Sequence, residues 1–371
     1  MANVNKAPFP WFGGKSKAAA AVWAALGDVQ HYVEPFFGSG AVLLNRPHPA
    51  NRPYRSETVN DLDGFVVNFW RAVQWYPDAT AEAASWPVAE ADKTARQLAL
   101  IRWRDAGAVE RLAGDAAWCD PVMAGWWAWA VAVQIGAFDT THAWIADPDT
   151  GVIVKQGRGS ARAPGVQHSL PHVSCDGRGV RQPKLRAPGV LDPIAPEHGR
   201  SALDDWGQHY HNLAMSEIIR WFRHLSARLR HVRILNGDWS RLTSRATTKT
   251  INVLYKGGVS GVFLDPPYAS EHDRKIYAHN ADGVAEAVRE WCLDNGNDPQ
   301  YRIVLAGFDD EHTDLLSRGW TVSASGVMSG YMPGGYKSLG GSGQMHRDCL
   351  WFSPHCLRPS DDAQLPLWEA S

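Results

Sequence analysis

The stretch HYVEPFFGSGAVLLN, residues 31–45, gives the main indication of the fold. Tyr32 and Val33 form a short apolar run, a glycine-rich loop follows, and the residues after Gly40 begin a helix. Glycines let a backbone approach a ligand closely, and the first turn of a helix presents N–H groups to a carboxylate or a phosphate. Strand, glycine loop and helix in this order predict the opening of a doubly wound α/β sheet. Taken alone, the G-x-G loop also fits an ordinary strand-to-helix turn.

The next segment, TVNDLDGFVVNFWRAVQ at residues 58–74, repeats the pattern of strand, turn and helix. The helical half has apolar residues at helical spacing, which predicts a buried face: Phe65, Val66, Phe69, Trp70 and Val73. Before this helix, Asp61 lies at the end of the presumed second strand. A carboxylate at that position is well placed to accept hydrogen bonds from the ribose hydroxyls of a nucleoside cofactor. The spacing does not say which cofactor.

The remainder of the chain alternates again after a long interruption. Residues 75–137 have a helical pattern rich in alanine and tryptophan, and residues 150–200 are rich in Gly, Pro and Arg with weak periodicity. Further strand patterns are VRILNGD, VSGVFLDPPY, YRIVLAG, WTVSAS and DCLWFS, with the helical patterns VAEAVREWCLD and HTDLLSRG between them. The simplest account is one α/β domain interrupted by an inserted module.

The apolar run Gly261-Val262-Phe263-Leu264 ends abruptly in Asp265-Pro266-Pro267-Tyr268. Proline lacks a backbone N–H and has a fixed φ, so two prolines stop a strand and stiffen the path after it. In isolation, Asp265 reads as a turn residue, because Asp and Pro are common turn formers.

Composition and cysteine usage exclude several classes of protein. The chain of 371 residues is 44% apolar and 20% charged, as in globular proteins, and has no apolar run of the length that spans a bilayer. The N-terminal residues lack a signal-peptide core, so we expect a cytoplasmic protein without a membrane partner. The cysteines form no CxxC pair, so we expect neither a disulfide framework nor a structural metal site; they are Cys119, Cys175, Cys292, Cys349 and Cys356.

Four motifs in order carry a family resemblance: Phe12-Gly13-Gly14-Lys15, EPFFGSG at 34–40, the acid of NDLD at 60–63, and DPPY at 265–268. Together they resemble the D12 class (Dam-type) of adenine-N6-specific DNA methyltransferases. The resemblance covers about residues 1–75 and 230–353 and not the middle. It implies a Rossmann-like methyltransferase sheet, S-adenosyl-L-methionine as the methyl donor, double-stranded DNA as the partner, and an inserted target-recognition region.

Carried over residue by residue, the resemblance assigns roles along both flanks. The expected cofactor-binding residues are Trp11, Lys15, Glu34, Phe36, Gly38, Gly40, Asp61, Asp238, Trp239 and Asp265. The expected catalytic residues are Asp265, Pro266, Pro267 and Tyr268. No metal is implied.

The chemistry of the DPPY motif agrees with these roles. An exocyclic adenine N6 is a poor nucleophile because its lone pair is delocalised into the ring. The Asp265 carboxylate and the Pro266 carbonyl accept one N–H each and direct the lone pair toward the methyl group, an arrangement that the stiff backbone holds in advance. Tyr268 offers a ring for stacking on the base, which has to be flipped out of the duplex.

DNA contacts are expected in the basic middle of the chain. Although the formal net charge is −2, residues 155–190 hold seven Lys or Arg against the single acid Asp176. Charge runs are usually solvated loops, but beside a DNA-modifying domain we expect phosphate contact. The predicted DNA-binding residues are Arg158, Arg162, Arg178, Arg181, Lys184, Arg186 and Lys337.

The resulting expectation is an adenine-specific DNA methyltransferase. Residues 1–75 and 230–355 form its catalytic core, 76–229 the largely helical and irregular recognition region, and 356–371 a tail. Restriction–modification is the expected setting, while the recognition sequence, a restriction partner and the oligomeric state cannot be read from the sequence. Two alternatives stay open: methylation of another amino group (cytosine N4, RNA adenine or protein glutamine), and an inactive DNA-binding relative.

Overall fold

The computed structural model divides the chain into two compact units, which are described separately. The first comprises Met1–Phe12, Leu62–Arg230 and Ile234–Asn236, and the second Gly13–Asp61, His231–Arg233 and Gly237–Ser371. The residues that the structure describes are 6–9, 11, 15–47, 55–85, 90–133, 144–146, 153–155, 203–244, 247–248, 258–267, 283–324 and 348–358.

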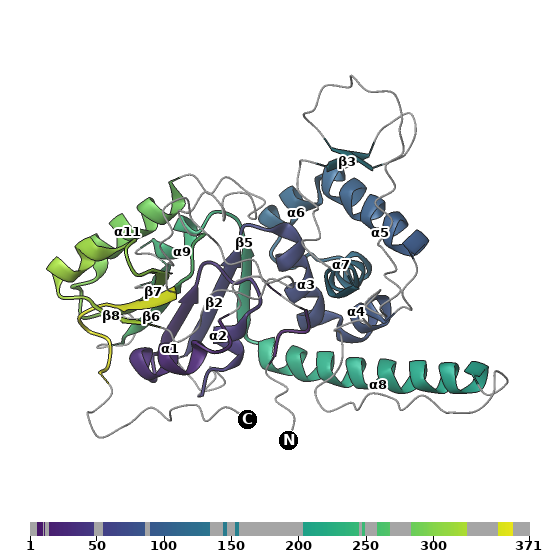
Figure 1. The fold of residues 1–371 in the computed structure, drawn as a ribbon, viewed down its shortest axis with the longest axis horizontal. Helices are drawn as coiled ribbons and strands as arrows, with labels where there is room; N and C mark the ends of the chain where they lie inside the picture. Colours follow the sequence, from purple (N-terminus) through teal and green to yellow (C-terminus); the bar gives the residue numbers. More distant parts are fainter. Residues whose placement is uncertain are drawn as a thin grey trace, which may run out of the picture. The chain divides into compact units, whose positions relative to one another are not determined.

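Within the described residues, seven strands form one sheet in the order β5-β2-β1-β6-β7-β9-β8 (Figure 1). Their bounds are β1 His31–Glu34, β2 Ser56–Asp61, β5 Val232–Asn236, β6 Ser260–Leu264, β7 Tyr301–Phe308, β8 Thr321–Ala324 and β9 Asp348–Phe352. Strand β1 pairs in parallel with both β2 and β6, and β6 pairs in parallel with β7. Strand β9 is antiparallel to both β7 and β8. This mixed, mostly parallel α/β sheet confirms the predicted class and is compatible with a methyltransferase fold.

The strand order reverses between β1 and β6, because the chain adds β2 on one side of β1 and later places β6 on the other. In open α/β sheets the ligand crevice lies at this point, outside the carboxyl ends of the strands. Strands β1 and β6 are buried along their whole length, as expected for strands covered on both faces.

Short helices accompany the sheet: α1 Ala19–Leu26, α2 Ala41–Leu44, α9 Ser240–Thr243, α11 Val284–Asn295 and the 3₁₀ helix η3 Thr313–Arg318. Two of them differ from the sequence pattern. The stretch KSKAAAAVWAAL, residues 15–26, has strong helix propensity throughout, but residues 16–18 form a turn in which the Lys15 carbonyl accepts from the N–H groups of Ala18 and Ala19. HTDLLSRG forms a 3₁₀ helix in place of an α-helix, and Gly319, with φ 82°, ends it in the left-handed region.

The first unit is mainly helical. Its elements are α3 Gly64–Trp75, α4 Pro77–Ala84, α5 Glu90–Trp103, the π-helical segment η1 Arg104–Ala108, α6 Val109–Gly114, α7 Pro121–Val133, α8 Leu203–Leu229, and the antiparallel pair β3 Trp144–Ala146 and β4 Ile153–Lys155. Helix α7 packs on α4 through Gly125, where a Cβ would lie 2.5 Å from the Ala83 Cβ. The helical character predicted for residues 75–137 is confirmed over the described part.

Helix α3 forms where the sequence pattern placed it. The Asp63 side chain caps its N-terminus by accepting from the Phe65 N–H at 2.8 Å, and the five apolar residues expected on its inner face are buried. Arg71 is also buried, and its guanidinium donates to the carbonyl oxygens of Ile234, Leu112, Asp115 and Trp118. These bonds offset the cost of burying the charge and join α3 to distant segments of the same unit.

Neither a membrane-spanning helix nor a metal-ligand cluster occurs among the described residues. None of the helices has the length and apolar content needed to cross a bilayer. In the same part of the chain, no three His, Cys, Asp or Glu side chains gather as metal ligands would. The limits of the predicted recognition region, 76–229, stay a prediction.

Candidate active site

Three carboxylates lie at the carboxyl ends of adjacent parallel strands in the second unit. Glu34 is the last residue of β1, Asp61 is the last residue of β2, and Asp265 directly follows β6. The registers pair Glu34 with Val59 on one side and Val33 with Val262 on the other. Asp61 and Asp265 therefore lie just beyond the end of β1, at the reversal of strand order.

The glycine loop between β1 and α2 is held against the end of β2. The Gly38 N–H donates to the Asp61 Oδ2 at 2.7 Å, and the Phe37 N–H donates to the Asn60 carbonyl at 2.9 Å. Gly38 and Gly40 have φ of 46° and 64°, a left-handed conformation that other residues rarely adopt. The G-x-G pattern is therefore required by the path of the loop.

Asn60 joins this loop to the segment after β5. Its Nδ2 donates to the carbonyl oxygens of Pro35, at 3.1 Å, and Gly237, at 2.8 Å, and the Gly237 N–H donates to the Asp61 carbonyl. Sequence reasoning singled out Asp61 and missed Asn60. The available signal in the sequence was an amide directly before the acid, in the NDLD motif.

Two aromatic rings face each other across these loops. The Phe36 and Trp239 rings have centroids 6.1 Å apart and planes inclined by 24°. The preceding residue, Asp238, accepts from the Ser240 N–H at 3.0 Å and so caps the short turn of α9. The structure thus brings Phe36 and Trp239 together, while the contact it shows for Asp238 is a structural one.

Glu34 is buried, with 2% of its surface exposed. The Tyr32 hydroxyl donates to its Oε2 at 2.9 Å. Burial raises the pKa of the Glu34 carboxyl well above its ordinary value; the Tyr32 bond opposes this rise, and the charges of Asp265 and Asp61 add to it. A cationic group beside Glu34 would oppose this rise, because an opposite charge favours the ionised carboxylate.

Asp265 forms an ion pair with Lys15. The Lys15 Nζ lies 3.0 Å from the Asp265 Oδ1, and the two side chains are 14% and 21% exposed. Burial raises the pKa of the Asp265 carboxyl, and the Lys15 ammonium opposes that rise. Lys15 was expected to contact the cofactor, and no sequence pattern indicated that it would pair with the aspartate of DPPY.

The backbone after Asp265 is described as far as Pro267. Pro266 is buried and Pro267 half-buried. Tyr268 lies outside the described residues, as do all seven residues predicted to bind DNA: Arg158, Arg162, Arg178, Arg181, Lys184, Arg186 and Lys337. Their roles stay predictions.

This arrangement can now be compared with known proteins. Residues 11–94 match the model of the D12 class N6 adenine-specific DNA methyltransferases. The resemblance noted from the motifs is confirmed over this segment, which includes Lys15, the glycine loop and Asp61. Asp265 lies beyond the matched residues. No curated protein matches the chain.

The match to this family indicates a DNA methyltransferase. It also includes Trp11, which the resemblance assigned to the cofactor. In the structure Trp11 belongs to the first unit, where its ring contacts those of Phe9 and Trp127 at centroid distances of 5.8 and 6.3 Å. A role in cofactor binding stays a prediction for this residue.

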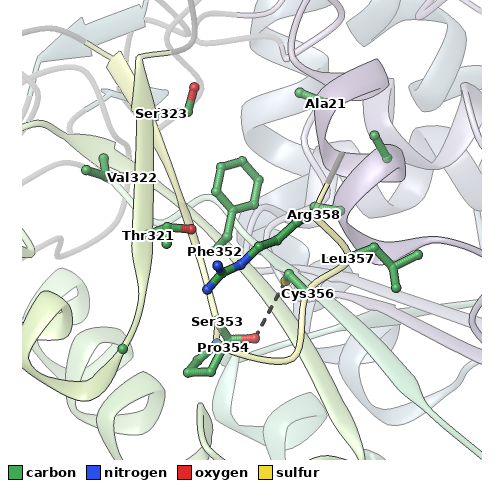
Figure 2. Close-up of a pocket in the computed structure, with 13 residues that line it drawn as sticks. Ala21, Thr321, Val322, Ser323, Phe352, Ser353, Pro354, Cys356, Leu357 and Arg358 are labelled. Carbon is green, nitrogen blue, oxygen red and sulfur yellow. Dashed lines mark hydrogen bonds between the residues drawn. The ribbon is translucent and has the colours of Figure 1, made fainter. Parts of the chain in front are cut away.

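A separate pocket of about 250 Å³ lies in the second unit between α1 and the strands β8 and β9. Figure 2 shows Thr321 and Val322 on one side, Ala21 on the other, and a hydrogen bond between Ser353 and Cys356 at its edge. None of the residues predicted for the active site lines this pocket. The carboxylates at the strand ends, and not this pocket, are the candidate site.

Proposed function

We propose that this protein transfers a methyl group from S-adenosyl-L-methionine to the N6 atom of adenine in double-stranded DNA. The observation that carries the proposal is the position of Asp265. It follows β6 directly, at the reversal of strand order, and is paired with Lys15 beside the strand that ends in Glu34. The family match at residues 11–94 supports a DNA methyltransferase.

The residues present fit the proposed cofactor. Its ammonium and sulfonium groups are cationic, and Glu34, Asp61 and Asp265 offer carboxylates at one edge of the sheet. The left-handed Gly38 and Gly40 let the loop backbone approach a ligand closely. When bound, S-adenosyl-L-methionine supplies an electrophilic methyl group.

Each residue of the proposed cofactor site has its own role. Asp61, already fixed by the Gly38 N–H, accepts from the ribose hydroxyls, because a carboxylate has about four lone-pair sites. Phe36 and Trp239 contribute apolar ring surface for the adenine ring of the cofactor. Glu34 faces the amino acid portion.

Asp265 and Pro266 act on the acceptor amino group. Each accepts one N–H of adenine N6, through the carboxylate and the backbone carbonyl, so that the nitrogen lone pair points to the methyl carbon. With the cofactor bound, N6 would form the bond to the methyl carbon as the carbon–sulfur bond breaks and leaves a neutral thioether, and the surplus N6 proton would pass to the Asp265 carboxylate and then to water. Hydrogen-bond acceptors that are already in position lower the activation barrier, because no free energy is needed to reorganise them during the reaction. Lys15 orients Asp265 and favours its ionised form.

The target amino group of a paired adenine is not accessible inside the duplex. Flipping the base costs a few kcal/mol, which stacking and pocket contacts offset. Tyr268 is the proposed stacking residue.

An aspartate at the first position of the tetrapeptide favours adenine over the other amino groups. In enzymes that this motif resembles, serine accompanies cytosine N4 and asparagine accompanies protein glutamine. The remaining alternative, an inactive DNA-binding relative, is disfavoured by the complete set of Gly38, Gly40, Asp61 and Asp265.

Acceptor classes can be compared directly. The protein is incubated with S-adenosyl-L-methionine labelled in the methyl group and with duplex DNA, RNA or a protein extract. We expect label in duplex DNA alone. Label in RNA or protein identifies one of the other amino-group substrates, and cofactor binding with no label in any acceptor identifies an inactive relative; either outcome overturns the proposal.

A further inference from the structure

Helix α8 has one apolar face that is buried in the first unit. Its buried residues are Ile218, Trp221, Phe222, Leu225 and Leu229. This face packs against α3 and α4. The helix is therefore fixed along its second half, and its opposite face is held in a constant orientation.

The opposite face is basic. Arg220 and Arg223 are three positions apart, so they lie on one side of the helix, and Arg230 directly follows its last residue, Leu229. All three are exposed, with 72% of the Arg220 side chain and 64% of the Arg223 side chain accessible. Arg228 lies on the flank of this face. The chain as a whole has a formal net charge of −2, so average composition does not account for these arginines.

A structural explanation covers only part of this set. Cations near the C-terminus of a helix interact favourably with its dipole, which accounts for Arg228 and Arg230. Arg220 and Arg223 lie too far from that end. They form exposed ion pairs with Glu217 and Asp78 respectively. Ion pairs with this much exposure contribute little to the stability of the fold. Each arginine can therefore leave its carboxylate partner and bind a phosphate.

Two exposed aromatic residues lie at the junction of α3 and α4, the two helices that pack on α8. Trp75 and Tyr76 join α3 to α4 and are 50% and 53% exposed. The residues around them contact α8: Gln74 donates from Nε2 to the Leu229 carbonyl at 2.6 Å, and Asp78 pairs with Arg223.

Because the residues on either side of the aromatic pair contact α8, we group the exposed residues of this region as the α8 face: Arg220, Arg223, Arg230, Trp75 and Tyr76. Guanidinium groups bind phosphate oxygens, and exposed rings pack on sugars and unpaired bases.

We propose that the α8 face binds the sugar–phosphate backbone of the DNA substrate. This inference rests on the proposed function. It adds a second contact surface, distinct from the basic segment at residues 155–190, and the arginines and the rings have separable roles. Each arginine neutralises a phosphate, so it contributes to the salt dependence of binding. The rings contribute contact that does not depend on salt.

The test is the affinity for a DNA duplex, measured by fluorescence anisotropy at several salt concentrations. The test variant carries Arg220→Gln, Arg223→Gln and Arg230→Gln. A matched control removes the same charge from exposed arginines elsewhere, with Arg102→Gln, Arg318→Gln and Arg358→Gln. Thermal unfolding of both variants checks that the fold is retained.

We expect the slope of log affinity against log salt to fall by about 0.9 for each arginine that contacts a phosphate, and to stay unchanged in the control. Trp75→Ala should weaken binding at every salt concentration and leave the slope unchanged. If the wild-type protein binds DNA and the test variant keeps its slope, the α8 face is not a DNA contact, while the proposed function stands. If the wild-type protein neither binds nor methylates DNA, the proposed function fails, and this inference with it.

Discussion

Asp61→Asn isolates the contribution of one carboxylate to cofactor binding. In the wild-type protein the Gly38 N–H donates to the Asp61 Oδ2 at 2.7 Å. The asparagine side chain has the same shape and keeps an oxygen that can accept this bond, so the glycine loop should keep its path. What is lost is the negative charge opposite the ribose hydroxyls. Hydrogen bonds to charged groups contribute about 1.5–3 kcal/mol and neutral ones about 0.5–1.5, so each bond weakens by about 1 kcal/mol.

For two ribose hydroxyls the loss is about 2 kcal/mol, which corresponds to about a 30-fold rise in Kd. The assay is isothermal titration calorimetry with S-adenosyl-L-methionine. The control is Asp63→Asn, because Asp63 caps α3 and has no proposed cofactor contact. Asparagine caps a helix about as well as aspartate, so that variant should keep its stability and bind the cofactor normally. An Asp61→Asn Kd within about threefold of the wild-type value would refute the ribose contact.

Two further predictions concern other charged pairs. Lys15→Met removes the cation that opposes the rise in the Asp265 pKa, so this pKa should rise further. Because the ionised carboxylate accepts the N–H, the kcat/KM of Lys15→Met should begin to fall at a higher pH than that of the wild type as the solution is acidified. The control variant Lys17→Met should keep the wild-type dependence of kcat/KM on pH. Identical pH profiles for Lys15→Met and wild type would contradict the pairing. Glu57→Ala removes the carboxylate 3.0 Å from the buried Arg46 and should cost about 3–5 kcal/mol in chemical unfolding. A loss below about 1 kcal/mol would show that Arg46 does not need this partner.

The part of the site built from local signals could be predicted from the sequence. The end of β1, the glycine loop and Asp61 follow from strand, turn and helix patterns within a few dozen residues. Two prolines mark the end of β6 and so place Asp265. The parallel pairing of β1 with β6 then follows from the doubly wound class, and it brings these segments to one edge.

The missed features depend on residues that are far apart in the chain. Lys15 and Asp265 are separated by 250 positions, and neither residue carries a local sign of its partner. The same holds for Arg71, whose guanidinium is satisfied by four distant carbonyl groups, and for Arg46 with Glu57. Periodicity indicates which face of an element is buried, but it does not identify the residue that a buried charge will meet.

The basic face of α8 was missed for a different reason. A charged outer face is ordinary in a surface helix, so it carries no signal in the sequence. The proposed role also involves Trp75 and Tyr76, which lie at the junction of α3 and α4, and the packing of these helices on α8 cannot be read from the sequence.

The central claim is methylation of adenine N6 with Asp265 as an acceptor of the amino hydrogen. Duplex DNA is incubated with S-adenosyl-L-methionine and either wild-type protein or Asp265→Ala, then digested to nucleosides and analysed by mass spectrometry. The account predicts N6-methyladenine from the wild type and none from the variant, with DNA binding retained by the variant. N4-methylcytosine in place of N6-methyladenine, or N6-methyladenine formed by Asp265→Ala at the wild-type rate, would contradict it.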